Sequence, residues 1–87
     1  MNTPALPTLA IVIVNWNAGD QLRVCLQAVA AAGRMRFRLQ HVVVVDNASS
    51  DDSLLNLPDD ALPLQVIRNP DNRGFGAACN QGARLCT

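Results

Sequence analysis

Three short apolar runs define the hydrophobic pattern of this 87-residue chain: residues 9–14, residues 41–45 and residues 64–67. All three contain β-branched residues, and the second holds four consecutive valines after His41. Runs without polar alternation are typical of strands that are buried on both faces, as in parallel sheets. The pattern therefore predicts three parallel strands.

Helical spacing occupies the intervals between and after these runs. The first predicted helix starts at an Asp20 cap and stops near Gly33, with one apolar face made of Leu22, Cys25, Leu26 and Val29. A short second helix is predicted over 53–57, capped from residues 49–51 and closed by Pro58. The third is predicted over 76–86, with these residues inward: Ala78, Cys79, Gly82, Leu85 and Cys86. The order βαβαβα predicts a three-layer α/β fold of Rossmann-like type, with right-handed crossovers.

Composition and length limit the domain organisation and the classes of partner. Residues 1–8 are interpreted as a leader, 9–87 as one domain, and 34–38 as a basic connecting loop. Hydrophobic residues make up 49% of the chain, which favours a folded domain over disorder. Seven Arg balance seven Asp, with no Lys or Glu. This neutral balance argues against a nucleic-acid or acidic-membrane surface, because both require clustered positive charge.

Cysteine usage and the short apolar runs bear on the compartment. Three cysteines without a C-x-x-C pair favour small buried thiols in a reducing cytoplasm over a disulfide framework or a zinc site. Residues 1–8 carry two prolines and no positive side chain, which does not fit a signal peptide. No run approaches the ~20 residues that a membrane span requires. We therefore expect a cytoplasmic location without a transmembrane segment.

Polar, turn-forming segments follow each predicted strand, at residues 15–20, 46–52 and 68–76. In open α/β sheets, ligands bind beyond the carboxyl ends of the strands. Each segment alone is ordinary turn chemistry, since Asn, Asp, Gly and Ser dominate turns and helix caps. Together they bring an aromatic ring, an acid and an arginine to one edge, which favours a ligand with a ring and an anionic group.

Three residues of this edge carry the candidate chemistry, each with a structural alternative. Trp16 offers a flat surface for a nucleobase, or it packs on a neighbouring loop. Asp46 can accept an N–H from a base edge, cap the next helix, or bind a metal ion. Arg73 precedes the third helix and suits a diphosphate, or it is a solvated surface residue.

Other motifs give weaker signals. The G-x-G-x-x-small pattern that starts at Gly74 does not follow the first strand, so it is a weak dinucleotide fingerprint. A chain without Lys cannot form a P-loop. His41 begins a strand and is interpreted as a strand-edge residue. A phospho-receiver role for Asp46 would need further acids where Asn15 and Asn17 stand.

Three segments resemble family 2 glycosyltransferases, in particular the rhamnosyltransferase-like members of that family. They are 11–17 (IVIVNWN), 42–53 (VVVVDNASSDDS) and 69–82 (NPDNRGFGAACNQG). The resemblance implies the nucleotide-binding half of a GT-A fold. It implies binding of a nucleotide-diphosphate sugar, UDP- or dTDP-linked, for inverting transfer in polysaccharide or cell-surface glycan synthesis.

The resemblance also implies roles for individual residues. Val14 and Trp16 would line the base, with Trp16 replacing the usual Tyr and losing its hydroxyl. Asp46 would accept the base N–H, and Arg73 with Gly74 would lie near the diphosphate. The remaining candidates that it places in the nucleotide site are Asn15, Asn17, Asn47 and Asn80.

Two features of the family have no counterpart here. The family's metal-binding D-x-D motif follows a fourth strand, and its catalytic carboxylate follows later still. The pairs Asp51-Asp52 and Asp59-Asp60 are interpreted as a helix start and a surface loop. We therefore expect no catalytic or metal residue within the 87 residues, no transfer by them alone, and Mg²⁺ or Mn²⁺ in a complete enzyme. The alternative function is a non-catalytic α/β module that associates with itself or a partner through an open sheet edge.

Overall fold

The computed structural model describes residues 7–32 and 37–86. Three strands form in the predicted places: β1 over Thr8–Asn15, β2 over Arg38–Asp46 and β3 over Leu64–Arg68. Helix α1 spans Asp20–Ala31 and helix α2 spans Phe75–Arg84, with a short 3-10 helix, η1, over Asp59–Ala61. The predicted α/β class is therefore confirmed.

The three strands form one parallel sheet in the order β1-β2-β3, so that β2 is central. The register aligns the carboxyl ends, with Asn15 opposite Asp46 and Asp46 opposite Arg68. All four valines of 42–45 are fully buried, because β2 has a strand on each side and a helix over each face. The unbroken apolar run had predicted this burial.

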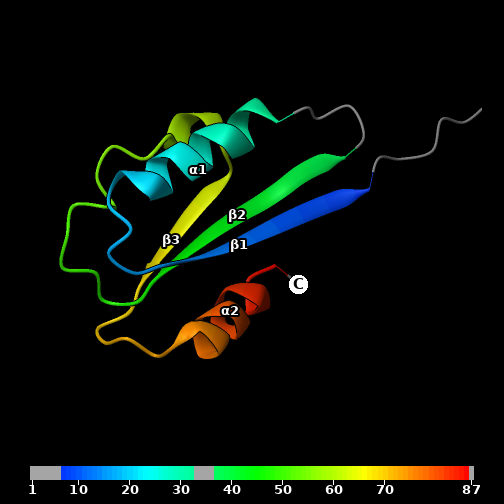
Figure 1. The fold of residues 1–87 in the computed structure, drawn as a ribbon. Helices are drawn as coiled ribbons and strands as arrows, with labels where there is room; N and C mark the ends of the chain where they lie inside the picture. Colours follow the sequence, from blue (N-terminus) through cyan, green and yellow to red (C-terminus); the bar gives the residue numbers. More distant parts are fainter. Residues whose placement is uncertain (1–6, 33–36, 87) are drawn as a thin grey trace, which may run out of the picture.

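The two helices cover opposite faces of the sheet (Figure 1). Side chains of a strand alternate between faces, so Val42 and Val44 pack under α1 with Leu22 and Leu26. On the other face, Val43 and Val45 pack with Ala78 of α2. The fold is thus three-layered, as expected of the Rossmann-like half of a GT-A domain.

The predicted second helix over 53–57 is wrong. Residues 51–56 form turns, and the helical turn η1 comes after them. Asn56 has a φ of 57°, in the left-handed region that no right-handed helix accommodates. In addition, the Ser53 hydroxyl points inward and donates to Asp51 Oδ1 at 2.6 Å, so this segment is built around side-chain hydrogen bonds.

Several details of the two long helices also differ from the sequence-based expectation. The N-cap of α1 is Gly19, and Asp20 lies in the first turn, where it pairs with Arg23 at 3.4 Å. Cys25 is exposed, and Leu85 is exposed beyond the end of α2. Helical periodicity identifies the apolar face of each helix but predicts more buried positions than the structure has, because each helix covers only part of the sheet. Gly33 and most of the proposed leader and basic loop lie outside the described residues.

The outer edges of β1 and β3 have no strand partner among residues 7–32 and 37–86. Association through such an edge stays a prediction. Neither α1 nor α2 is long and apolar enough to cross a membrane.

Candidate functional site

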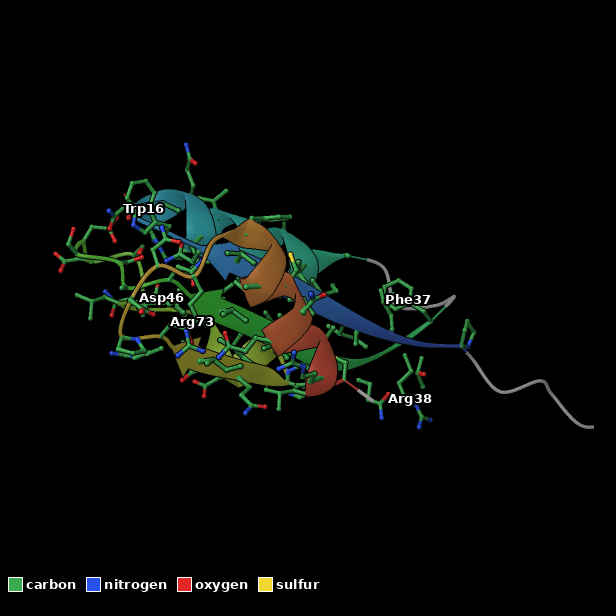
Figure 2. All side chains as sticks on the ribbon, turned by 90° about the horizontal axis from the view of Figure 1, so that it is seen from below. Trp16, Phe37, Arg38, Asp46 and Arg73 are labelled. Atoms are coloured by element: carbon green, nitrogen blue, oxygen red, sulfur yellow. The ribbon has the colours of Figure 1, made fainter. Side chains whose placement is uncertain are left out.

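The three segments that follow the strands meet at one end of the sheet. Figure 2 shows Trp16, Asp46 and Arg73 gathered at this end, while Phe37 and Arg38 lie at the opposite end. Parallel strands bring their carboxyl ends to the same edge, which is why residues far apart in the sequence meet there. The three principal candidates of the sequence analysis are thus brought together.

Asp46 forms the buried centre of this edge, with only 3% of its surface exposed. Its Oδ1 accepts hydrogen bonds from Asn15 Nδ2 at 2.8 Å and from the Ser49 hydroxyl at 2.6 Å. Its Oδ2 accepts one hydrogen bond, from the Ser49 backbone N–H at 3.1 Å. The two contacts with Ser49 are those expected if Asp46 capped a following helix, but here they stabilise a turn and no helix follows directly. Because each carboxylate oxygen has two acceptor positions, one position of Oδ2 has no donor among the residues that the structure describes.

Asn15 holds this carboxylate in place from the neighbouring strand. Its Nδ2 lies within hydrogen-bonding distance of Asp46 Oδ1, of the Ser49 hydroxyl at 3.2 Å and of the Ser53 hydroxyl at 2.8 Å. Its Oδ1 is buried and accepts no hydrogen bond from any described residue. The amide of Asn15 therefore acts as a donor to the loop that follows β2, which explains its burial at the strand end.

The loops after β1 and β2 are joined by reciprocal hydrogen bonds. The Asn17 N–H donates to the Ser49 hydroxyl at 2.9 Å, and the Ser50 N–H donates to Asn17 Oδ1 at 2.7 Å. The Gly19 N–H donates to Asp51 Oδ2 at 2.9 Å. The Ser53 hydroxyl bound to Asp51, helped by the N–H groups of Ser53 and Gly19, lowers the pKa of this carboxyl. The negative charge of Asp51 is therefore favoured in the folded loop.

A second network of side-chain amides connects β2, β3 and α2. The reciprocal pair Asn69–Gln81 has two hydrogen bonds of 2.8 Å, and Asn69 Nδ2 also donates to Asn47 Oδ1 at 3.1 Å. Asn47 in turn donates from Nδ2 to the Gly74 carbonyl at 3.2 Å and accepts from the Arg73 N–H at 3.4 Å. Asn47 and Asn69 are 2% and 6% exposed. These amides fix the segment that leads into α2.

Helix α2 begins at this segment without a side-chain cap. Its N-cap is Gly74, whose φ of 80° is a conformation that glycine adopts without a Cβ clash. The first N–H groups of a helix have no intrahelical acceptor, and the helix dipole makes them favourable to anions. The guanidinium of the preceding Arg73 is half-exposed, and its one ion pair with a described residue is to exposed Asp71, at 3.3 Å. A cation and a set of donors thus lie next to each other.

Three candidate side chains lie outside the two hydrogen-bond networks described above. Trp16 is 59% exposed, so its ring is open to solvent at the end of β1. Val14 packs with the core cluster under α2, so its side chain serves the core. Asn80 is exposed on α2 and makes no side-chain hydrogen bond to another described residue, whereas the next residue, Gln81, does.

The hollow beside Asp46 is acidic. A pocket of 280 Å³ opens there between the loop after β2 and the end of β3. Its lining includes three carboxylates and one guanidinium, from Asp46, Asp51, Asp52 and Arg68. This excess of negative charge opposes a phosphate group. The pocket therefore suits a neutral group that carries N–H or O–H donors.

The described residues do not provide a site for the divalent ion that the family resemblance implies. Within residues 7–32 and 37–86, no group of three or more His, Cys, Asp or Glu side chains is placed to hold a metal ion. Asp51 and Asp52 both line the pocket, but N–H and O–H groups of Gly19 and Ser53 already take three of the four acceptor positions of the Asp51 carboxylate.

Sequence reasoning missed four residues that build this edge: Ser49, Ser53, Asn69 and Gln81. The sequence predicts Ser49 as a cap candidate in the segment after the second strand, and Ser53 as the first residue of a helix that does not form. Asn69 carried a usable signal, because each strand is followed or ended by an Asn: Asn15, Asn47 and Asn69. Gln81 carried none, since one glutamine on a helix resembles any solvated position.

Comparison with known protein families gives one match. The model of the family described as glycosyl transferase family 2 matches residues 10–87. A search of curated proteins and a search of solved structures returned no match. The matched span covers all the described strands and helices except the first two residues of β1.

Proposed function

Because the chain belongs to glycosyl transferase family 2, we propose that residues 9–87 bind the donor of a glycosyltransferase, a nucleotide-diphosphate sugar. The observation that carries the proposal is that Trp16 and Arg73, from two separate loops, lie with Asp46, the last residue of β2, at the carboxyl edge of the sheet. A ring, an acceptor and a cation at one edge match the base and the diphosphate of such a donor. Transfer with inversion, onto a polysaccharide or cell-surface glycan, belongs to the same proposal.

The base lies near Asp46 in this proposal. A free acceptor position on Oδ2 takes the ring N–H of uracil or thymine, and guanine has an equivalent N–H. Cytosine lacks this proton, so a carboxylate here disfavours it. The indole of Trp16 supplies a stacking surface, for which contributions of ~1–3 kcal/mol per base are typical. UDP- or dTDP-sugars are therefore the proposed donors.

The diphosphate lies on the other side of this edge, at the start of α2. The acidic pocket next to Asp46 repels phosphate, whereas the N–H groups of α2 and the Arg73 guanidinium attract it. The exposed Arg73–Asp71 pair costs little to break, since such surface pairs contribute about 0–1 kcal/mol. The charges of the site thus orient the nucleotide, base toward Asp46 and phosphates toward α2.

Calorimetric titration of the chain with UDP, dTDP, GDP and CDP tests the proposal. We expect saturable binding of at least one of the first three and weaker binding of CDP. The variant Asp46→Asn should reduce the preference for UDP over CDP by about tenfold, in the range of one base-edge contact. The matched control is Asp52→Asn, which changes an exposed acid of the same pocket.

Absence of saturable binding by every nucleotide, in a sample shown to be folded by circular dichroism, would refute the proposal. Equal UDP-to-CDP preference in wild type and Asp46→Asn would refute the role of Asp46 alone. The unfolding midpoint of each variant is measured in parallel, because Asp46 is buried.

A further inference from the structure

We propose that Gln81, acting through Asn69 and Asn47, is a positioning residue for the diphosphate end of the site. The inference rests on the proposed function and adds a residue outside the family-derived set. Its basis is a continuous series of three side-chain amides that runs from the middle of α2 to the loop at the start of the same helix.

The direction of this series is fixed at its backbone end. The Arg73 N–H can only donate and the Gly74 carbonyl can only accept, so Asn47 must face them with Oδ1 and Nδ2, respectively. Asn47 Oδ1 then requires a donor from Asn69, which presents Nδ2. Asn69 Nδ2 gives its second proton to Gln81 Oε1, and Asn69 Oδ1 accepts from Gln81 Nε2. Gln81 therefore completes the pairing of Asn69 with one acceptor and one donor.

This arrangement fixes the position of the loop that precedes α2. Asn47 and Asn69 are almost fully buried, so neither can replace a lost partner with bulk water. Gln81 lies in the second turn of α2, and the series joins this turn to Gly74, the N-cap. The amides thus hold the backbone at 73–74, from which the Arg73 side chain and the first N–H groups of α2 extend, at a fixed position relative to the carboxyl ends of β2 and β3.

Two substitutions separate the donor and acceptor functions of Gln81. Gln81→Met keeps a similar volume and removes both hydrogen bonds. Gln81→Glu keeps an acceptor for Asn69 Nδ2 but, when ionised, places an oxygen against Asn69 Oδ1. Protonation of that glutamate restores the donor. Gln27→Glu is the matched control, because Gln27 is an exposed glutamine on α1, away from the site.

The measured quantity is the ratio of UDP affinity to uridine affinity, determined by calorimetry for each variant. We expect Gln81→Met to lower this ratio by about tenfold, with uridine affinity unchanged. Gln81→Glu should lower it at pH 8 and recover toward the wild-type ratio near pH 4, where a glutamate is largely protonated, each compared with wild type at the same pH. A residue with only a structural role would weaken uridine and UDP alike.

Hydrogen exchange of the backbone amides at 73–77, without nucleotide, provides a second measurement. Both Gln81 variants should exchange faster there than wild type and Gln27→Glu. An unchanged UDP-to-uridine ratio together with unchanged exchange would overturn the inference while leaving the proposed function intact. If the wild-type chain binds uridine and UDP equally, or binds neither, the proposed diphosphate site fails and the inference fails with it.

Discussion

The side-chain amide of Asn15 donates a 2.8 Å hydrogen bond to the carboxylate of Asp46, its register partner on the adjacent strand. Both side chains are buried, at 1% and 3% exposure, at the point where two parallel strands end. An amide next to a buried carboxylate satisfies one of its oxygens without adding a second charge. The pair therefore fixes the orientation of the acid.

Replacing Asn15 with Asp tests this relationship, because it places two carboxylates side by side. We expect a loss of roughly 1–3 kcal/mol in the free energy of unfolding at pH 7, typical of a buried group deprived of its partner. The loss should be smaller near pH 4, because protonation of the introduced carboxyl supplies a donor in place of the missing amide. Urea denaturation at the two pH values measures this. A loss independent of pH would contradict the charge-based explanation.

Asp51 gives a second pH-dependent prediction. Its pKa is lowered in the folded chain, so its contribution to stability is present above the unfolded value of about 4 and is lost as the pH falls below it. The variant Asp51→Asn should therefore unfold at a lower temperature than wild type at pH 7, and the difference should shrink at pH 3. Asp52→Asn is the control, since no side-chain hydrogen bond joins Asp52 to another described residue. Equal differences at both pH values would exclude the proposed cause.

Gly82 permits the close packing of α2 on the sheet. A Cβ at this position would lie 2.5 Å from Val12 Cγ1 and 3.1 Å from Val45 Cγ2. We expect Gly82→Ala to destabilise the fold by about 1–3 kcal/mol, as overpacked core positions do. Gly76→Ala, in the same helix but with no atom within 4 Å of its Cβ, should be neutral or stabilise by about 0.5–1 kcal/mol. Chemical denaturation of both variants distinguishes packing from helix propensity.

The exposed ring of Trp16 predicts an effect on binding without an effect on folding. Trp16→Ala should weaken UDP binding by about 1–3 kcal/mol, the range of a lost stacking surface, while Trp16→Tyr should keep most of the affinity. Neither variant should change the unfolding midpoint appreciably, since the ring is 59% exposed. Val24→Ala, at an equally exposed position on α1, serves as the control. Unchanged UDP affinity in Trp16→Ala would exclude the stacking role.

The strands and the site edge were predictable because they depend on burial and topology. Four valines in a row are typical of a strand covered on both faces, and the parallel arrangement then brings Trp16, Asp46 and Arg73 together. The turn over 51–56 was not predictable from local propensity, because its conformation depends on Ser53 reaching Asn15, 38 positions earlier. Gln81 depends in the same way on Asn69, so its role emerges only when β3 and α2 have folded together.

Two side-chain networks support the site, one around Asp46 and Asp51 and one formed by the amides of Asn47, Asn69 and Gln81. Their composition predicts how the site responds to salt. Amides and hydroxyls make up most of both networks, with Asp46 and Asp51 the two charged members. Dissolved ions screen exposed charges over about 8 Å at physiological ionic strength, but they act weakly on buried dipoles. Added salt should therefore lower the affinity for a diphosphate while leaving the hydrogen bonds around Asp46 unaltered. Ionic strength thus provides a means of separating phosphate recognition from base recognition without changing a residue.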